Sequence, residues 1–345
     1  MKRNWIFILF ITVIAVACNN KEKAPDVSHI KVDLQLKRFD QDFFAIDTNN
    51  IDASLDVLDK KYPNFFQDYL FRILAIEPQP DTVKKYVTHF IRDYKVVKDS
   101  ADKVFGNMKE IKEEVEQGLR YVKYYFPNYK TPTQLLTFIG PFDAFSKVGA
   151  YASGDIITYD AIGAGLQLHM GKDYSFYKTE AAKQLFPAYA SRRFEPAYIP
   201  VNAMSNIIDD MYPARYQGLP LVEQMIEAGK RMYVLDHLLP EVADTLKTGY
   251  TKKQLDGAYA NEQGIWSFFL QNDLIYNSDP NIVKDYMNDA PNTQVLGPAS
   301  PGFIGQFVGW QIVKKWMSKK EQKNLEELMR TPAKQIFEEA KYRPE

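Results

Sequence analysis

Cys18 is the only cysteine of the chain, and it stands where a bacterial lipoprotein carries its lipid. Lys2 and Arg3 give the chain a positive start, and the unbroken apolar run that follows, residues 5–17, ends in Ala17. This run is too short to span a bilayer, but it suits a cleavable signal. The sequence therefore predicts that residues 1–17 are removed as a signal peptide. Acyl chains such as palmitate on the Cys18 thiol would then anchor the protein to a membrane.

No pattern elsewhere in the chain fits metal or nucleophile chemistry. A zinc peptidase helix needs two histidines one turn apart with a glutamate beside the first, and the histidines here are far apart in sequence. The chain has neither a Gly-x-Ser-x-Gly elbow nor a phosphate-binding loop, and Ser153 is expected to be a turn residue. We predict no catalytic residue, no metal site and no cofactor. The histidines are His29, His89, His169 and His237.

Acidic residues keep an enzymatic hypothesis open. Glu223 and Glu227 are spaced by one helical turn, and two carboxyl groups buried together could split their pKa values for acid–base catalysis. Glu227 also precedes Lys230 by three residues, which favours a solvated or salt-bridged helix face. An unrecognised hydrolase site would require Glu227, His237 and Glu262 to converge on one cleft with a bound metal ion.

The charge balance argues against nucleic acid as a partner. The chain has 43 basic and 44 acidic residues, and removal of Lys2 and Arg3 with the signal leaves 41 basic residues, a net charge near −3. Such a chain has no basic excess for binding phosphates, so the lipid would hold it at the membrane. With Cys18 acylated, no disulfide can form.

Aromatic residues are unusually frequent, with 22 tyrosines and 22 phenylalanines. Most must fill the core of a large helical body. Three clusters could instead line a ligand groove or a protein interface, because tyrosine combines an apolar ring with a polar hydroxyl. These clusters are residues 62–66, 121–129 and 174–177.

Hydrophobic periodicity predicts an α+β fold that is mainly α-helical with one small embedded β-sheet. Residues 30–37 alternate like a half-buried strand, and residues 135–168 suggest strands and hairpins with a turn at 153–155. Gly305 and Gly309, four apart in an apolar helix, predict close helix packing. Helices are expected to begin near Asp81, Val104 (to Val122), Pro200, Leu219, Thr251 (towards Phe269), Asp279, Gly302, Ser318 and Thr331.

The same pass along the chain suggests three parts. Residues 1–17 are the signal peptide, residues 18–28 are the lipidated N-terminus with a polar tether, and residues 29–345 form a single mainly helical domain. No internal linker argues for dividing that domain.

The order of short motifs along nearly the whole mature chain resembles the gliding motility lipoprotein GldB family. Each motif alone is moderately specific, and their number and order make the resemblance. After the lipid-attachment site come RFD at 38–40, KYP at 61–63, GKDY at 171–174, IEAGK at 226–230, SPG at 300–302, GWQIV at 309–313 and KYRP at 341–344.

The resemblance implies an envelope lipoprotein required for gliding motility in Bacteroidetes, acting beside other gliding-motility envelope proteins. The arrangement is also distantly similar to predicted zinc-dependent peptidases, in which a small sheet precedes a metal-binding helix. In this chain that helix would be residues 202–209 or residues 223–230, and neither carries the required histidines. The resemblance therefore implies a zincin-like fold without its metal site.

Three functional hypotheses follow. The first is a non-catalytic structural or interaction component of the gliding machinery, anchored through Cys18. The second is a zincin-like peptidase or hydrolase with an unrecognised site, and the third is a solute-binding envelope lipoprotein, which an aromatic-lined pocket would favour. Because Asn19 is not the aspartate that retains many lipoproteins in the inner membrane, we expect the outer membrane, facing the periplasm.

Overall fold

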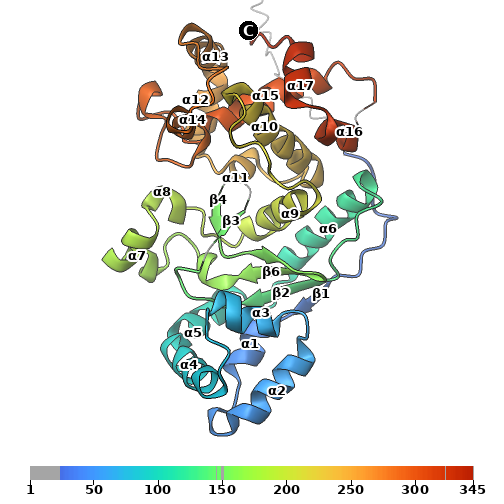
Figure 1. Ribbon diagram of the computed structural model, residues 1–345. Coiled ribbons are helices and arrows are strands. Elements are labelled where there is room, and N and C mark those ends of the chain that lie inside the picture. Colours follow the sequence, from blue (N-terminus) through green and yellow to red (C-terminus); the bar gives the residue numbers. More distant parts are fainter. Residues whose placement is uncertain (1–23, 145, 149–150, 323, 345) are drawn as a thin grey trace, which may run out of the picture.

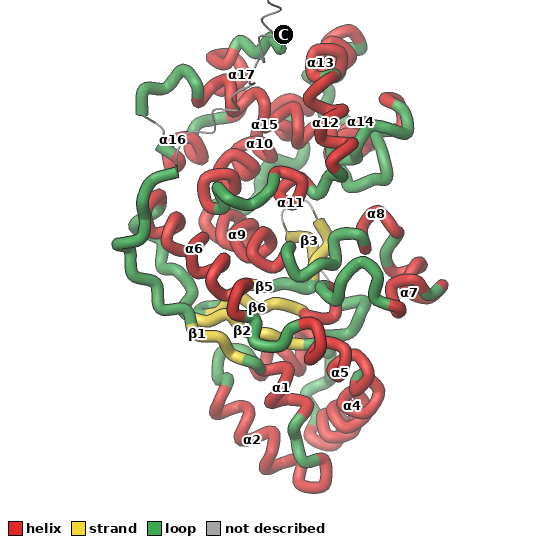
Figure 2. The backbone as a smooth tube through the Cα atoms, turned by 180° about the vertical axis from the view of Figure 1, so that it is seen from behind, coloured by secondary structure: helices red, strands yellow, loops and turns green. Residues whose placement is uncertain are grey.

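A small β-sheet lies between two groups of helices in the computed structural model (Figures 1 and 2). Its parallel strands β1, β2 and β6 lie side by side in that order, and β5 pairs antiparallel with β6 at one edge. Strands β3 and β4 form a separate hairpin. The described residues are 24–144, 146–148, 151–322 and 324–344. The strands are β1 (Gln35–Lys37), β2 (Gln134–Phe138), β3 (Ser146–Val148), β4 (Tyr151–Ser153), β5 (Ile156–Ile157) and β6 (Ala161–Gly165).

Helices cover both faces of the sheet and build a second layer beyond it (Figure 1). The first group lies below the sheet in Figure 1: α1 (Phe39–Phe44), α2 (Ile51–Lys61), α3 (Phe66–Asp68), α4 (Pro80–Asp93) and α5 (Lys95–Val104). On the other face lie α6 (Lys109–Tyr125) and α9 (Tyr198–Met211), with α7 (Glu180–Leu185) and α8 (Ala188–Ser191) at one end of the sheet. The second layer contains α10 (Leu221–Leu238), α11 (Asp244–Thr248), α12 (Lys252–Ala260), α13 (Glu262–Gln271), α14 (Pro280–Met287), α15 (Ile304–Met317), α16 (Leu325–Arg330) and α17 (Ala333–Ala340). This architecture confirms the predicted fold class, and the zincin-like likeness stays a prediction.

Strand β2 joins two cores through the alternation of its side chains. Leu135 packs into the core beneath α6 and α9, whereas Leu136 and Phe138 pack into an aromatic core under α1 and α3. In that aromatic core, Phe39 and Tyr69 meet edge to face with ring centroids 4.7 Å apart. Each such buried side chain contributes about 1.5–3 kcal/mol, so the sheet is held from both sides.

Helices α10 and α15 cross at backbone contact, which confirms the packing role predicted for Gly305 and Gly309. A side chain at Gly309 would run into the backbone of Met225, and one at Gly229 would run into the backbone of Gly309. A side chain at Gly305 would run into Met287 Sδ and the Tyr286 carbonyl oxygen of α14, and would meet Met225 Cγ of α10 at 3.2 Å. The two longest helices of the second layer therefore lie closer than side chains would allow.

Two predicted elements have different limits in the structure. The strand expected over residues 30–37 is reduced to β1, because only its last three residues pair with β2. The helix expected from Val104 begins at Lys109, since Met108 has a left-handed φ of 50° that breaks the helical path.

Two predicted helices towards the C-terminus also differ. The helix expected from Thr251 to Phe269 is broken at Asn261 into α12 and α13, although its predicted capping box at Thr251 is present. The predicted start at Ser318 is wrong: α16 begins at Leu325, where the Asn324 side chain accepts a hydrogen bond from the Glu327 N–H.

The predicted anchor, Cys18, and the signal peptide lie outside the described residues. The described chain starts at Ala24, and Val27 is already buried in the core shared with α6 and α10. Within the described residues, none of the helices combines the length and the apolar character needed to cross a bilayer.

Candidate functional site

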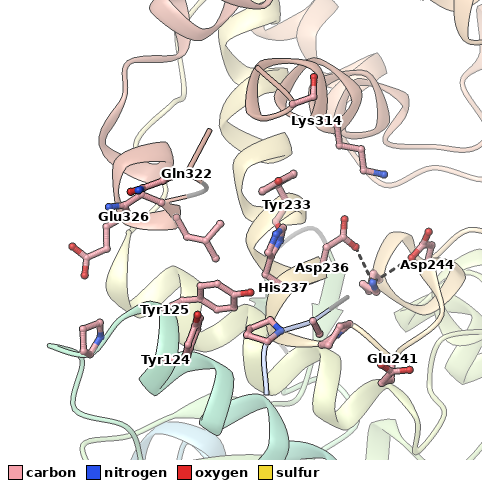
Figure 3. Close-up of a pocket in the computed structure, with 18 of the residues that line it drawn as sticks. Tyr124, Tyr125, Tyr233, Asp236, His237, Glu241, Asp244, Lys314, Gln322 and Glu326 are labelled. Carbon is pink, nitrogen blue, oxygen red and sulfur yellow. Dashed lines mark hydrogen bonds and ion pairs between the residues drawn. The ribbon is translucent and has the colours of Figure 1, made fainter. Parts of the chain in front are cut away.

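An open groove of about 1410 Å³ lies where α10, α11, α15 and α16 meet the end of α6 (Figure 3). We call it the α10 groove. Polar and aromatic side chains dominate its walls, and Ala24 and Pro25 of the N-terminal segment form part of its rim. The side chains used below are Tyr124, Tyr125, Tyr233, Asp236, His237, Glu241, Asp244, Lys247, Tyr259, Lys314 and Glu326.

A buried lysine holds together one end of the groove. The Lys247 side chain is 1% exposed, and its Nζ lies 2.8 Å from Asp236 Oδ1 and 3.2 Å from Asp244 Oδ1. The indole N–H of Trp310 donates to the other oxygen of Asp236 at 2.8 Å. A lysine is buried this deeply only when its charge is paired. Asp236 is therefore fixed in place by α11 on one side and α15 on the other.

Aromatic rings line the other wall of the groove. His237 packs against Tyr233 with ring centroids 4.5 Å apart and against Tyr125 at 5.6 Å. His237 Nδ1 lies 2.8 Å from the Tyr233 carbonyl oxygen, which can only accept, so this nitrogen carries the proton. Tyr124 and Tyr125 come from the predicted 121–129 cluster, and Tyr124 is 47% exposed. Tyr124, Tyr125, Tyr233 and His237 therefore line this part of the groove.

The groove also holds a cation on aromatic rings. Lys314 Nζ lies 3.2 Å from the centre of a Trp310 ring and 5.9 Å from that of Tyr259. Burial and the negative charges of Asp244 and Asp236, with a further contribution from Glu262, raise the pKa of Tyr259. The carboxylates thus place a negative potential on this wall.

A second polar cluster is buried beneath the β3–β4 hairpin. His169 Nε2 lies 2.8 Å from Asp155 Oδ2, and its Nδ1 lies 3.2 Å from the Glu195 carbonyl oxygen. The Asn202 amide donates to Asp155 at 2.7 Å and to Ser153 Oγ at 3.0 Å. Both ring nitrogens of His169 are therefore engaged by oxygens of the protein.

These bonds set the charge state of Asp155. Burial alone would raise the pKa of Asp155, but the positive charge of His169 and hydrogen bonds from His169, Asn202 and the Gly165 N–H lower it. The cavity beside Ser153 and His169 measures about 10 Å³, at the lower limit for one water molecule. The cluster has no room for a substrate and ties the hairpin and the end of β6 to α9.

The predicted turn at Ser153 is present in this cluster. Ser153 Oγ accepts a hydrogen bond from the backbone N–H of Asp155 at 3.0 Å, the local bond that a serine makes at a turn. No sequence motif indicates that Asp155 and His169 are partners.

The four residues considered for an unrecognised site are held in separate places. Glu227 accepts a hydrogen bond from Lys230 Nζ at 2.6 Å, as its spacing predicted, and Glu262 accepts one from Tyr342 at 2.5 Å. Glu223 lies in the first turn of α10. Of the four, His237 alone lines the α10 groove. It lies ten residues from Glu227 on the same helix, about 15 Å along the axis.

No group of three or more His, Cys, Asp or Glu residues is placed to hold a metal ion within the part of the chain that the structure describes. The residues that sequence reasoning missed are Asp236, Lys247 and Trp310. They come from three segments whose meeting depends on the crossing of α10 and α15. The available signal was the pair of glycines in α15, Gly305 and Gly309. They predicted that α15 packs closely against another helix, but they did not indicate which helix.

The fold and the groove define the class: a mainly helical α+β protein with a small parallel sheet and an open groove lined by tyrosines and carboxylates. The family model described as gliding motility protein GldB matches residues 20–344. The chain therefore belongs to the GldB family and is a gliding motility protein. No curated protein and no solved structure matches it.

Proposed function

We propose that this protein is a lipid-anchored component of the cell envelope that serves gliding motility by holding partner proteins, without catalysis. The observation that carries the proposal is the position of the α10 groove, whose rim includes Ala24 and Pro25. Ala24 is six residues from Cys18, and six extended residues reach about 20 Å. A lipid on Cys18 would therefore keep the groove close to the membrane surface.

The side-chain geometry supports a binding role over an acid–base role. Asp236 and Asp244 are paired with Lys247, and Asp236 also accepts from Trp310. A general acid or base needs a free path to the substrate proton, and the bonds of Asp236 occupy both its oxygens. His169 likewise directs both ring nitrogens at protein oxygens.

A gene replacement in the host tests the anchor. Cells that carry only Cys18→Ala, at normal abundance, should lose surface spreading, and wild-type protein should restore it. Spreading by the Cys18→Ala cells would show that the anchor is dispensable.

Isolation of the protein from envelope membranes under mild crosslinking should recover gliding-motility proteins, and recovery of none would count against a partner-holding role.

We further propose an outer-membrane location facing the periplasm, from the asparagine that follows Cys18. Protease treatment of intact cells should leave the protein uncut, whereas opening the outer membrane should expose it. Cleavage in intact cells would place it on the cell surface.

The groove also favours a second candidate, the solute-binding lipoprotein. Its tyrosines match the aromatic lining expected for that class, but its volume of about 1410 Å³ exceeds the roughly 300–1,000 Å³ of most small-ligand pockets. A small molecule that co-purifies with the protein in equal amounts would favour solute binding.

A further inference from the structure

We propose that the α10 groove binds an extended, lysine- or arginine-bearing segment of a partner protein. This inference rests on the proposed function, because it names the chemistry of the partner that the protein holds. The groove is open and too large for an ordinary small ligand, whereas a polypeptide segment can run along it.

Charge is the first argument for a basic segment. Among the described residues that line the groove, four are carboxylates and two are lysines. Lys247 is buried between Asp236 and Asp244, and these three side chains together carry one net negative charge. Glu241 is exposed at the rim, and Glu326, whose side chain is 25% exposed, forms an ion pair with Arg330 at 3.4 Å. A positive segment would meet this negative rim favourably, and the attraction would speed its approach.

The aromatic wall is the second argument. Lys314, which lines the groove, places its ammonium 3.2 Å from the centre of a ring of the buried Trp310 and 5.9 Å from that of Tyr259, so a cation already lies over aromatic faces at this wall. Tyr124, half-exposed on the opposite side of the groove, presents another such ring. The face of such a ring attracts a lysine or arginine cation, and the attraction strengthens as water is excluded.

The rigidity of the groove is the third argument. Asp236 is held by Lys247 from α11 and by Trp310 from α15, and the two long helices behind it touch through their backbones. A preformed groove lowers the ordering cost of binding, which then falls on the partner segment alone.

Peptide binding to the full mature protein in detergent micelles tests the proposal. The probe is a fluorescent peptide of about twelve alternating lysine and threonine residues, near 40 Å when extended. Peptides with glutamine or glutamate in place of lysine are its matched controls. We expect the lysine peptide to bind, the glutamine peptide to bind at least tenfold more weakly, and high salt to weaken the lysine peptide.

Variants of the protein locate the binding. Glu241→Gln and Glu326→Gln should each weaken the lysine peptide about threefold, the scale of one exposed charge pair. Tyr124→Ala should weaken it by a similar factor through the lost ring. Glu77→Gln removes one exposed carboxylate at the far end of the molecule, near α4, and should leave binding unchanged (Figure 1). An unchanged melting temperature shows that each variant is folded.

Several results would overturn the inference. One is equal affinity for the lysine and glutamine peptides. Another is an affinity for the lysine peptide that is unchanged in all three groove variants. Displacement of the peptide by chitohexaose would assign the groove to a sugar chain. Tighter peptide binding by Lys21→Gln/Lys23→Gln would make the protein's own tether the occupant. If partners are still recovered from envelope membranes while the peptide fails, the inference falls and the proposed function stands.

Discussion

Replacement of Gly309 by alanine should open the contact between α10 and α15. A Cβ built at Gly309 would lie 1.6 Å from the carbonyl oxygen of Met225, whereas real Cβ contacts essentially never fall under 3.0 Å. The clashing atom belongs to the backbone, so no change of rotamer can relieve it. The helices must separate by about 1.4 Å, the difference between these two distances.

The cost of that separation follows from the packing around it. A gap of about 0.5–1 Å already forfeits a quarter to a half of each dispersion contact, and Ile226, Val308 and Trp310 beside the crossing are fully buried. Overpacking typically costs about 1–3 kcal/mol and more where nothing can yield. Alanine is more favourable than glycine inside a helix by about 1 kcal/mol, which offsets part of this cost. From a cost of about 3 kcal/mol, the upper end of that range, we expect a net loss of about 2 kcal/mol, or roughly 4 °C in melting temperature at about 2 °C per kcal/mol.

Two other glycines provide matched controls. Gly257 and Gly264 lie inside α12 and α13, and a Cβ at either position meets nothing within 4 Å. Their alanine variants should therefore gain up to about 1 kcal/mol. Urea and thermal unfolding followed by circular dichroism measure all three. If Gly309→Ala proved as stable as these controls, the backbone contact between the helices would be refuted.

Three further variants test other parts of the structure. Asp236→Ala leaves the buried Lys247 with one carboxylate and should cost about 3 kcal/mol in urea unfolding; Lys247→Met, which removes the buried charge itself, should cost less, and the reverse order would contradict the pairing. The pKa of Asp155 is lower in the folded protein than its value of about 3.9 in the unfolded chain. Ionised Asp155 therefore stabilises the fold fully at pH values above the unfolded pKa, and this stabilisation is lost as the pH falls through the folded pKa. Asp155→Asn should therefore be less stable near neutral pH but lose less stability on acidification, and parallel pH curves for variant and wild type would sink this assignment. Thr251→Ala removes the capping box of α12 and should cost about 1 kcal/mol in melting experiments; no change would mean that the cap contributes nothing.

The sequence could predict what depends on local pattern. The capping box at Thr251, the start of α14 after Asp279 and the close packing at Gly309 follow from neighbouring residues alone, and each is present. The shortened strand β1 and the break at Asn261 could not be foreseen, because tertiary pairing decides where such patterns stop.

The candidate site was harder to predict than the fold. Asp236, Lys247 and Trp310 meet only because α10 and α15 cross, and 74 residues separate Asp236 from Trp310 along the chain. Asp155 and His169 lie in a stretch that was correctly expected to form strands and turns, but their pairing depends on how those strands fold back. Periodicity reports which face of an element is buried and says nothing about which distant side chain it meets.

The pairing of β1 with β2 has a consequence for how the chain folds. Gln35 is aligned with Gln134, so the first strand must wait for a partner about 100 residues downstream. Closing a loop of that length costs about 4 kcal/mol of chain entropy, and β1 cannot pair until β2, which ends at Phe138, has been synthesised. During synthesis β1 and the helices from α1 to α6 therefore emerge before the sheet can form. Assembly of the sheet is therefore a late step in the folding of this part of the chain.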